Sequence, residues 1–242
     1  MAFWRTAALV SEHHGRQRGS QMRMVMVAKQ KGGVGATTLA RELGVAAAAA
    51  GKRVVFVDLD PQGTLRGWWN RRTEGVKGEP NPGLATPAPE NMAAALERLR
   101  EAGIDLCIVD TPPSVHPFLG SVMHLADLIL LPTRPTTDDL DALPAILDLV
   151  EDSGRPFAFV VTQAPAGRSR LHDDAVPVLA QRGRVAPPLR IRADFPVAAA
   201  TGRTATEITS KGKAAEEVEA LWKFVAADLA KLGRKRASVV AS

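Results

Sequence analysis

The stretch KQKGGVGATTLA, residues 29–40, decides the fold. The apolar run before it, residues 23–28, predicts a buried strand. The segment after it, residues 37–50, predicts a helix that ends at Gly51. Glycines let a backbone approach phosphate, and the amides of a helix N-terminus point at it. The order of strand, glycine-rich turn and helix predicts a phosphate-binding loop, although a tight turn without a ligand would carry similar glycines.

This loop departs from the ordinary phosphate-binding pattern G-x-x-x-x-G-K-[ST] at two positions. Gln30 stands at the first glycine, and Ala36 stands at the lysine. A lysine at position 36 would contact the β- and γ-phosphates. One charged hydrogen bond is worth ~1.5–3 kcal/mol, or about ten- to a hundred-fold in affinity. Binding of a nucleotide therefore depends on what the rest of the site supplies.

Acidic side chains follow the next two predicted strands. Residues 53–60 end in Asp58 and Asp60, and residues 105–110 end in Asp110. The carboxyl ends of parallel strands form the ligand crevice, so we expect these acids beside the glycine loop. Clustered carboxylates repel one another unless a cation lies among them, and Mg²⁺ bridged to phosphate is the expected cation. On this reasoning Asp60→Ala leaves the stability of the nucleotide-free protein unchanged or raises it.

Strands and helices alternate along the rest of the chain. Apolar runs predict strands over residues 127–132, 156–161 and 188–192. Helices are predicted over residues 91–103, 139–154 (kinked at Pro144), 170–183 and 214–233. This alternation predicts a single α/β domain, a parallel sheet with helices on both faces. The predicted boundaries are a flexible extension over 1–21, the domain over 22–232 and a basic flexible tail over 233–242, with a loop at 70–90.

Composition and charge indicate the cellular compartment of the protein and the kinds of partner that it attracts. The net charge of +5 permits weak attraction to nucleic acid or anionic lipid. Cys107 is the single cysteine of the chain and has no disulfide partner, which favours a reducing, cytoplasmic compartment. No apolar run reaches the ~18 residues of a membrane-spanning helix. The helix over 214–233 carries acids that favour docking on the sheet, so we expect no stable membrane association.

Together these segments resemble the ParA/MinD family of deviant Walker-A ATPases. The loop of that family reads K-G-G-x-G-K-[ST], and Lys31 matches the lysine that marks it. DLDPQG (58–63) is similar to its switch I, and IVDTPP (108–113) to its Walker B strand. The resemblance extends over residues 23–230 and implies a single-domain P-loop NTPase fold of the small ParA type. It also implies ATP or ADP and Mg²⁺ as cofactors.

The resemblance implies a role for each matching residue. Lys31 would reach across an ATP-dependent homodimer to the partner's phosphates, and Asp60 would orient the attacking water. Thr37, Asp60 and Asp110 would hold Mg²⁺, with Asp58 behind them. The nucleotide-binding residues would be Lys31, Gly32, Gly33, Val34, Gly35, Ala36, Thr37 and Thr38.

Two further features have open interpretations. The resemblance implies that residues 161–165, where Thr162 replaces the usual Asn, complete the purine pocket with the segment after the sixth strand. Trp68 and Trp69 follow switch I and either pack on the core or anchor a partner.

Basic residues gather between positions 182 and 213, opposed there by Asp194 and Glu207. From charge alone, a solvated surface is favoured. Small ParA proteins bind nonspecific DNA through this region, so the resemblance favours a DNA surface. It also implies a centromere-binding ParB-like adaptor and a cytoplasmic, nucleoid-associated location. The implied DNA-binding residues are Arg190, Arg192, Arg203, Lys211 and Lys213.

Ala36 leaves the chemistry open between three interpretations. It is an engineered inactivating substitution, a natural divergence to a slow or inactive ATPase, or a loss for which Lys29 compensates. The predicted function is a ParA-type ATPase that partitions a plasmid, chromosome or other cargo, with catalysis impaired by Ala36. The alternative is a non-hydrolysing regulatory or scaffold protein on the same fold, such as a polar organiser or a secretion, cellulose or conjugative-transfer accessory.

Overall fold

The computed structural model describes residues 22–113 and 116–240, with side chains described as far as Leu232. The extension predicted for residues 1–21 lies outside these ranges. The strands are β1 (Arg23–Lys29), β2 (Val54–Asp58), β3 (Gly83–Ala85), β4 (Leu106–Pro113), β5 (Leu128–Thr133), β6 (Phe157–Ala164) and β7 (Arg184–Arg190). The helices are α1 (Ala36–Ala49), α2 (Thr64–Thr73), the 3₁₀ turn η1 (Pro89–Asn91), α3 (Met92–Glu101), α4 (Leu119–Met123), α5 (Thr137–Asp141), α6 (Leu143–Asp152), α7 (Arg170–Ala180), α8 (Asp194–Ala200), α9 (Ala205–Ile208) and α10 (Lys213–Val240).

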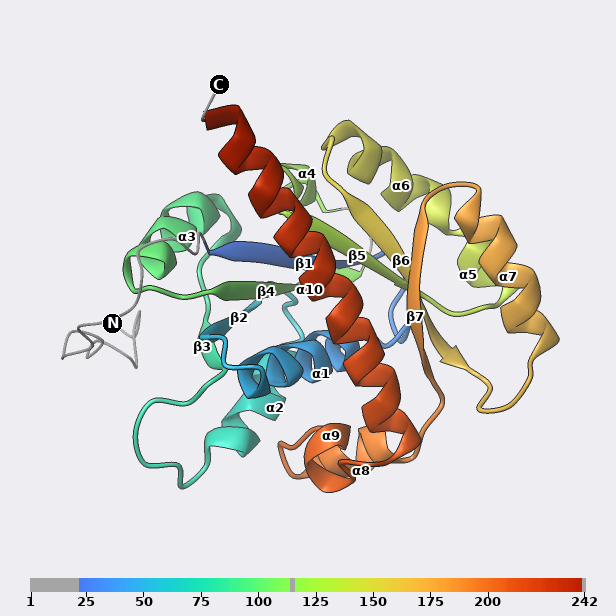
Figure 1. The fold of residues 1–242 in the computed structure, drawn as a ribbon, viewed down its shortest axis with the longest axis horizontal. Coiled ribbons are helices and arrows are strands. Elements are labelled where there is room, and N and C mark those ends of the chain that lie inside the picture. The colour runs from blue at the N-terminus through green and yellow to red at the C-terminus, as the bar shows by residue number, and fades with distance from the viewer. Residues whose placement is uncertain (1–21, 114–115, 241–242) are drawn as a thin grey trace.

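The strands form a parallel sheet in the order β3-β2-β4-β1-β5-β6-β7. The predicted parallel sheet with helices on both faces is confirmed (Figure 1). β1 lies between β4 and β5, so the chain changes direction across the sheet at the strand that leads into the glycine loop. A ligand crevice forms at such a switch point, outside the carboxyl ends of the strands.

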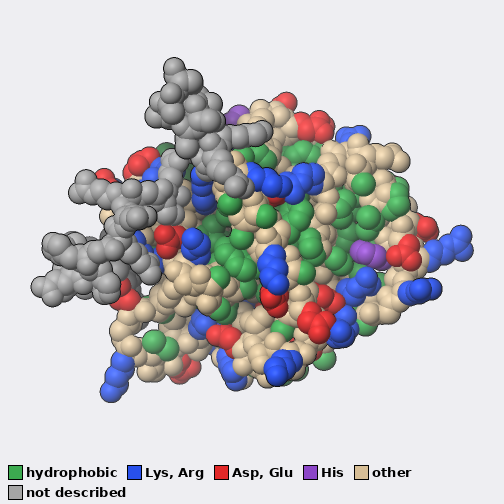
Figure 2. Space-filling view, viewed as in Figure 1, with side chains coloured by type: hydrophobic (Ala, Val, Ile, Leu, Met, Phe, Trp, Pro, Cys, Tyr) green, Lys and Arg blue, Asp and Glu red, His purple; other side chains and the backbone are tan. Residues whose placement is uncertain are grey.

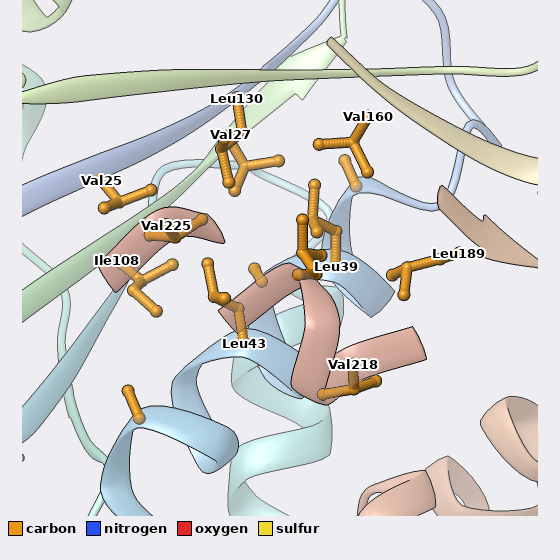
Figure 3. Packing of buried hydrophobic residues seen from close by; sticks show 14 of the residues in the cluster. Val25, Val27, Leu39, Leu43, Ile108, Leu130, Val160, Leu189, Val218 and Val225 are labelled. Atoms are coloured by element: carbon orange, nitrogen blue, oxygen red, sulfur yellow. The ribbon is translucent and has the colours of Figure 1, made fainter. Parts of the chain in front are cut away.

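Each face of the sheet has its own apolar core because side chains alternate along a strand. Val25 and Val27 of β1 face the core beneath α1, α2, α8, α9 and α10. Met24 and Met26 face the opposite core, beneath α3, α4, α6 and α7. Figure 3 shows the first core, in which Leu39 of α1 and Val225 of α10 lie near the strand residues. The predicted docking of the last helix on the sheet is therefore what the fold has.

Several elements differ from the sequence prediction. The predicted helix over 139–154 is two helices, α5 and α6, which meet at Ala142 with Pro144 in the first turn of α6. Proline is tolerated there because that turn's amides have no partner within the helix. α10 continues to Val240 where the sequence predicted a tail beyond 232. No helix within the described residues is long and apolar enough to cross a membrane.

The region after switch I is more ordered than the sequence indicates. Residues 83–85, inside the predicted loop, form β3 and pair with β2. Trp68 of α2 is fully buried, meets the Phe56 ring edge-on at 5.9 Å and donates its indole N–H to the Arg203 carbonyl. Trp69 packs beside this core and donates to the Pro82 carbonyl. The core-packing interpretation of Trp68 is therefore confirmed.

Candidate nucleotide site

The glycine loop joins β1 to α1 at the centre of the sheet. Gly33 and Gly35 have φ of 76° and 79°, a left-handed conformation that favours glycine, and Gly35 caps the N-terminus of α1. A cavity of about 360 Å³ opens over this loop. One of the predicted acids, Asp60, lines this cavity together with residues of the loop. The loop residues are Gly32, Gly33, Gly35, Ala36, Thr37 and Thr38. Val34 is buried beneath the loop and does not line the cavity.

The acids lie together, as the sequence predicts, and a lysine joins them. Asp60 and Asp110 both accept hydrogen bonds from the Lys29 ammonium, at 3.0 Å and 3.3 Å. All three side chains are buried, and Asp110 is fully enclosed. The sequence indicated a divalent cation among these carboxylates, whereas in this structure an ammonium of the chain itself neutralises them.

Thr37 contacts the same acid. Its hydroxyl donates to Asp110 at 2.6 Å, on the carboxylate oxygen that Lys29 does not contact. Burial raises the pKa of Asp110, while the Lys29 ammonium and the Thr37 hydroxyl oppose that rise by stabilising the charged form. The loop, β1 and β4 are therefore tied together through one buried carboxylate.

Asp58 organises the backbone rather than the cavity. Its carboxylate accepts hydrogen bonds from the Asp60 and Arg66 amides, at 3.1 Å and 2.9 Å. Asp60 in turn accepts the Gln62 amide at 3.0 Å. These bonds fix the turn between β2 and α2.

Lys31 points away from the loop's own cavity. Its ammonium donates to the Asp138 carbonyl and lies 3.8 Å from an Asp139 carboxylate oxygen. Asp139 itself accepts two hydrogen bonds from one edge of the Arg134 guanidinium, from Nε at 2.7 Å and from Nη2 at 2.9 Å. In this structure Lys31 rests on the start of α5, and it does not line the cavity over its own loop.

A second cavity of about 320 Å³ adjoins the loop and is lined by residues from β6, β7 and α8. Thr162 lines it, and its hydroxyl also donates to the Val34 carbonyl at 2.7 Å. Gln163 borders both cavities and donates its side-chain amide to the Gly33 carbonyl at 2.6 Å. Its φ of 53° is rare for a residue with a side chain. Gln163 lies in the segment 161–165 that the resemblance assigns to the purine pocket, but its bond to the glycine loop was not expected from the sequence.

The donor set fits Mg²⁺ as part of a nucleotide complex. Thr37, Asp60 and Asp110 offer oxygen donors, and magnesium is bound by one or two carboxylates together with substrate phosphates. Among the described residues no group of three or more His, Cys, Asp or Glu side chains is placed to hold a metal ion by itself. A metal at this place would therefore be held by these protein oxygens together with the phosphates of a nucleotide.

The implied DNA-binding residues differ in whether other groups of the protein engage their charged side chains. The Arg192 guanidinium pairs with Glu217 of α10 at 2.6 Å, an acid that the sequence did not place against it. Arg190 is half-buried and donates to the Pro165 and Gly167 carbonyls. Figure 2 shows Lys and Arg side chains interspersed with Asp and Glu over the face that carries α10.

The remaining implied DNA-binding residues are exposed. Lys213 pairs at the surface with Glu216 at 2.7 Å, and Arg203 donates to the Glu207 carbonyl. Lys211 is exposed and forms no ion pair with any described residue. Within the part of the chain that the structure describes, no carboxylate pairs with Arg203 or Lys211.

Two curated proteins are similar in sequence to this chain. The chain is 36% identical over 224 residues to the maintenance of carboxysome distribution protein A, McdA, of Gloeobacter kilaueensis, covering 89% of this chain and 98% of that protein. It is 33% identical over 157 residues to the chromosome-partitioning ATPase Soj of Thermus thermophilus, covering 55% of this chain and 63% of that protein.

A solved structure gives the same fold. The ATP complex of McdA from Cyanothece superposes with a TM-score of 0.69 at 19% identity, covering 88% of this chain and 98% of that chain. Residues 25–235 match the family described as the CobQ/CobB/MinD/ParA nucleotide binding domain. With its glycine loop, acidic strand ends and parallel sheet, the chain belongs to this CobQ/CobB/MinD/ParA family.

Proposed function

We propose that the chain binds ATP with Mg²⁺ at the β1–α1 loop and uses ATP-dependent dimers on nonspecific DNA to position a cargo in the cell. The observation that carries this proposal is the cavity that the glycine loop, Thr37 and Asp60 line together, with the buried Asp110 hydrogen-bonded to Thr37 beside it. Amides at the N-terminus of α1 would receive phosphate oxygens. The adjoining cavity beside Thr162 would take the base.

The cargo is proposed from the relatives. One is named for carboxysome distribution and another for chromosome partitioning, so both names describe positioning of a large object. The near-complete coverage of McdA favours a cargo that is a large protein assembly, recognised through an adaptor protein. A ParB-like adaptor on DNA is the other form of the same proposal.

The residues of the chain would divide the work of the site. Thr37, Asp60 and Asp110 would hold Mg²⁺, which supplies positive charge beside the phosphates when bound. Asp60 would also orient the attacking water, since it borders the cavity and its turn is fixed by hydrogen bonds. Lys31, which lies outside its own cavity, would serve the partner's site in a dimer.

Hydrolysis is proposed to be slow. Ala36 leaves α1 without a lysine of its own to stabilise charge developing between the β- and γ-phosphates. Its small side chain, at the start of α1, is buried in the core on that face of the sheet. The absence of a lysine at position 36 also favours the second candidate, a scaffold that binds nucleotide without hydrolysing it.

The test is binding of fluorescent ADP and ATP analogues, with dimerisation measured by light scattering and DNA binding by anisotropy. We expect binding of both nucleotides, with dimers and salt-sensitive DNA binding in ATP only. Lys52→Gln removes one exposed charge and is the control for nonspecific charge effects. Absence of any nucleotide binding in magnesium would contradict the proposed function. Binding of ATP with dimers but no turnover would favour the scaffold.

A further inference from the structure

Lys29 is buried at the end of β1. Its side chain is 6% exposed and contacts both Asp60 and Asp110. The pairing register between β1 and β4 shifts between Val27 and Lys29, at the point where the chain leaves the sheet for the loop. A buried ammonium is costly unless it is paired and hydrogen-bonded, and here two carboxylates meet that need.

Lys29 also lines the cavity over the glycine loop, and Ala36 lines the same cavity. Among the described residues that line this cavity, Lys29 is the only lysine or arginine. The positive charge missing from α1 is therefore present in the same cavity, delivered from the preceding strand.

We infer that Lys29 supplies the phosphate-facing positive charge that position 36 lacks. This inference rests on the proposed function, because it assigns a residue to the same nucleotide site. In this structure the ammonium neutralises Asp60 and Asp110. A lysine has a flexible four-carbon stem and a compact charge with three donors, so the ammonium can turn from the carboxylates to phosphate oxygens without moving β1.

A lysine that only neutralised buried acids would leave a different signature. Its removal would lower stability, and a new lysine at position 36 would act the same whether or not Lys29 is present. If both lysines serve phosphate, each makes the other partly redundant. The two positions are then coupled in nucleotide affinity, which a double-mutant cycle measures.

The experiment compares the unchanged chain, Lys29→Gln, Ala36→Lys and the double variant, by anisotropy of fluorescent ADP and ATP with magnesium. Lys29→Gln should weaken ATP binding about ten- to a hundred-fold. Adding Ala36→Lys to that variant should restore most of the loss. In the otherwise unchanged chain, Ala36→Lys should gain much less than it gains in the Lys29→Gln background. Lys52→Gln makes the same chemical change at an exposed position and should bind as the unchanged chain does.

Three outcomes would overturn the inference. Lys29→Gln could bind ATP as tightly as the unchanged chain or more tightly, which would make Lys29 only a partner or competitor at the carboxylates. Ala36→Lys could give equal gains in both backgrounds. If Lys29→Gln does not fold, Ala36→Lys alone decides, and a gain of about tenfold or more would refute Lys29 as the phosphate charge. Failure of the unchanged chain to bind nucleotide would instead remove the proposed function itself, and this inference with it.

Discussion

Replacing Asp60 by asparagine tests the buried charge arrangement most directly. Asp60→Asn keeps the shape of the side chain and an oxygen that can accept the Gln62 amide. It removes the charge that pairs with Lys29 at 3.0 Å, and leaves the Lys29 ammonium with Asp110 at 3.3 Å. The sequence alone predicts that losing a charge from an acidic cluster is neutral or stabilising. The structure predicts the opposite sign.

The magnitude follows from the contacts that remain. Loss of one charged hydrogen bond costs ~1.5–3 kcal/mol. The ~3–5 kcal/mol cost of a broken buried ion pair is an upper bound, because Asp110 still pairs with the ammonium. A destabilisation of 1 kcal/mol lowers the Tm of a domain of this size by roughly 2–4 °C, so we expect a fall of about 3–12 °C.

The assay is thermal and urea denaturation of the nucleotide-free protein with EDTA at pH 7. Asp148→Asn makes the same change on an exposed face of α6 and should have little effect. In the Lys29→Gln background the sign should reverse, because Asp60→Asn then relieves repulsion between two buried carboxylates that have lost their cation. A Tm of Asp60→Asn equal to or above that of the unchanged protein would refute the proposed role of Lys29 as the counter-charge.

Three further predictions concern other parts of the molecule. Glu42 is fully buried against the Ala205 amide, and burial raises the pKa of its carboxyl to about 7. Between pH 4.5 and about 7 the folded state therefore holds a proton that the unfolded state has released, so stability falls as the pH rises through this range. Glu42→Gln should remove this fall, gaining up to about 3 kcal/mol in urea denaturation at pH 8 and less at pH 5; equal pH profiles would contradict it. Gly44→Ala should destabilise by about 1–3 kcal/mol, since its Cβ would lie 2.3 Å from the Phe56 ring, whereas Gly67→Ala in α2 has room and should not; a more stable Gly44→Ala would show that Phe56 yields. Arg203→Ala with Lys211→Ala should weaken binding to any duplex alike and reduce the salt slope by about two, measured by anisotropy across salt concentrations; loss at one sequence only would indicate base recognition.

The sequence determined the architecture and the place of the candidate site in it. Apolar runs alternating with helical segments are sufficient to predict a parallel sheet, because buried strands in such a sheet need helices on both faces. The glycine loop after β1 and the acids toward the carboxyl ends of β2 and β4 had to meet, since the carboxyl ends of parallel strands lie at one edge. The short strand β3 escaped prediction, because three residues inside a Pro- and Gly-rich segment carry no period.

Only the tertiary structure decided which charges act on one another. Lys29 reaches acids 31 and 81 positions away, and Arg192 is neutralised by Glu217 from another element. Gln163 meets Gly33 across 130 positions, in a backbone conformation that its residue type disfavours. Local patterns fix which face of an element is apolar. The direction of a polar side chain at a strand end depends on register shifts and on neighbours distant in sequence, so its partner is set only when the sheet assembles.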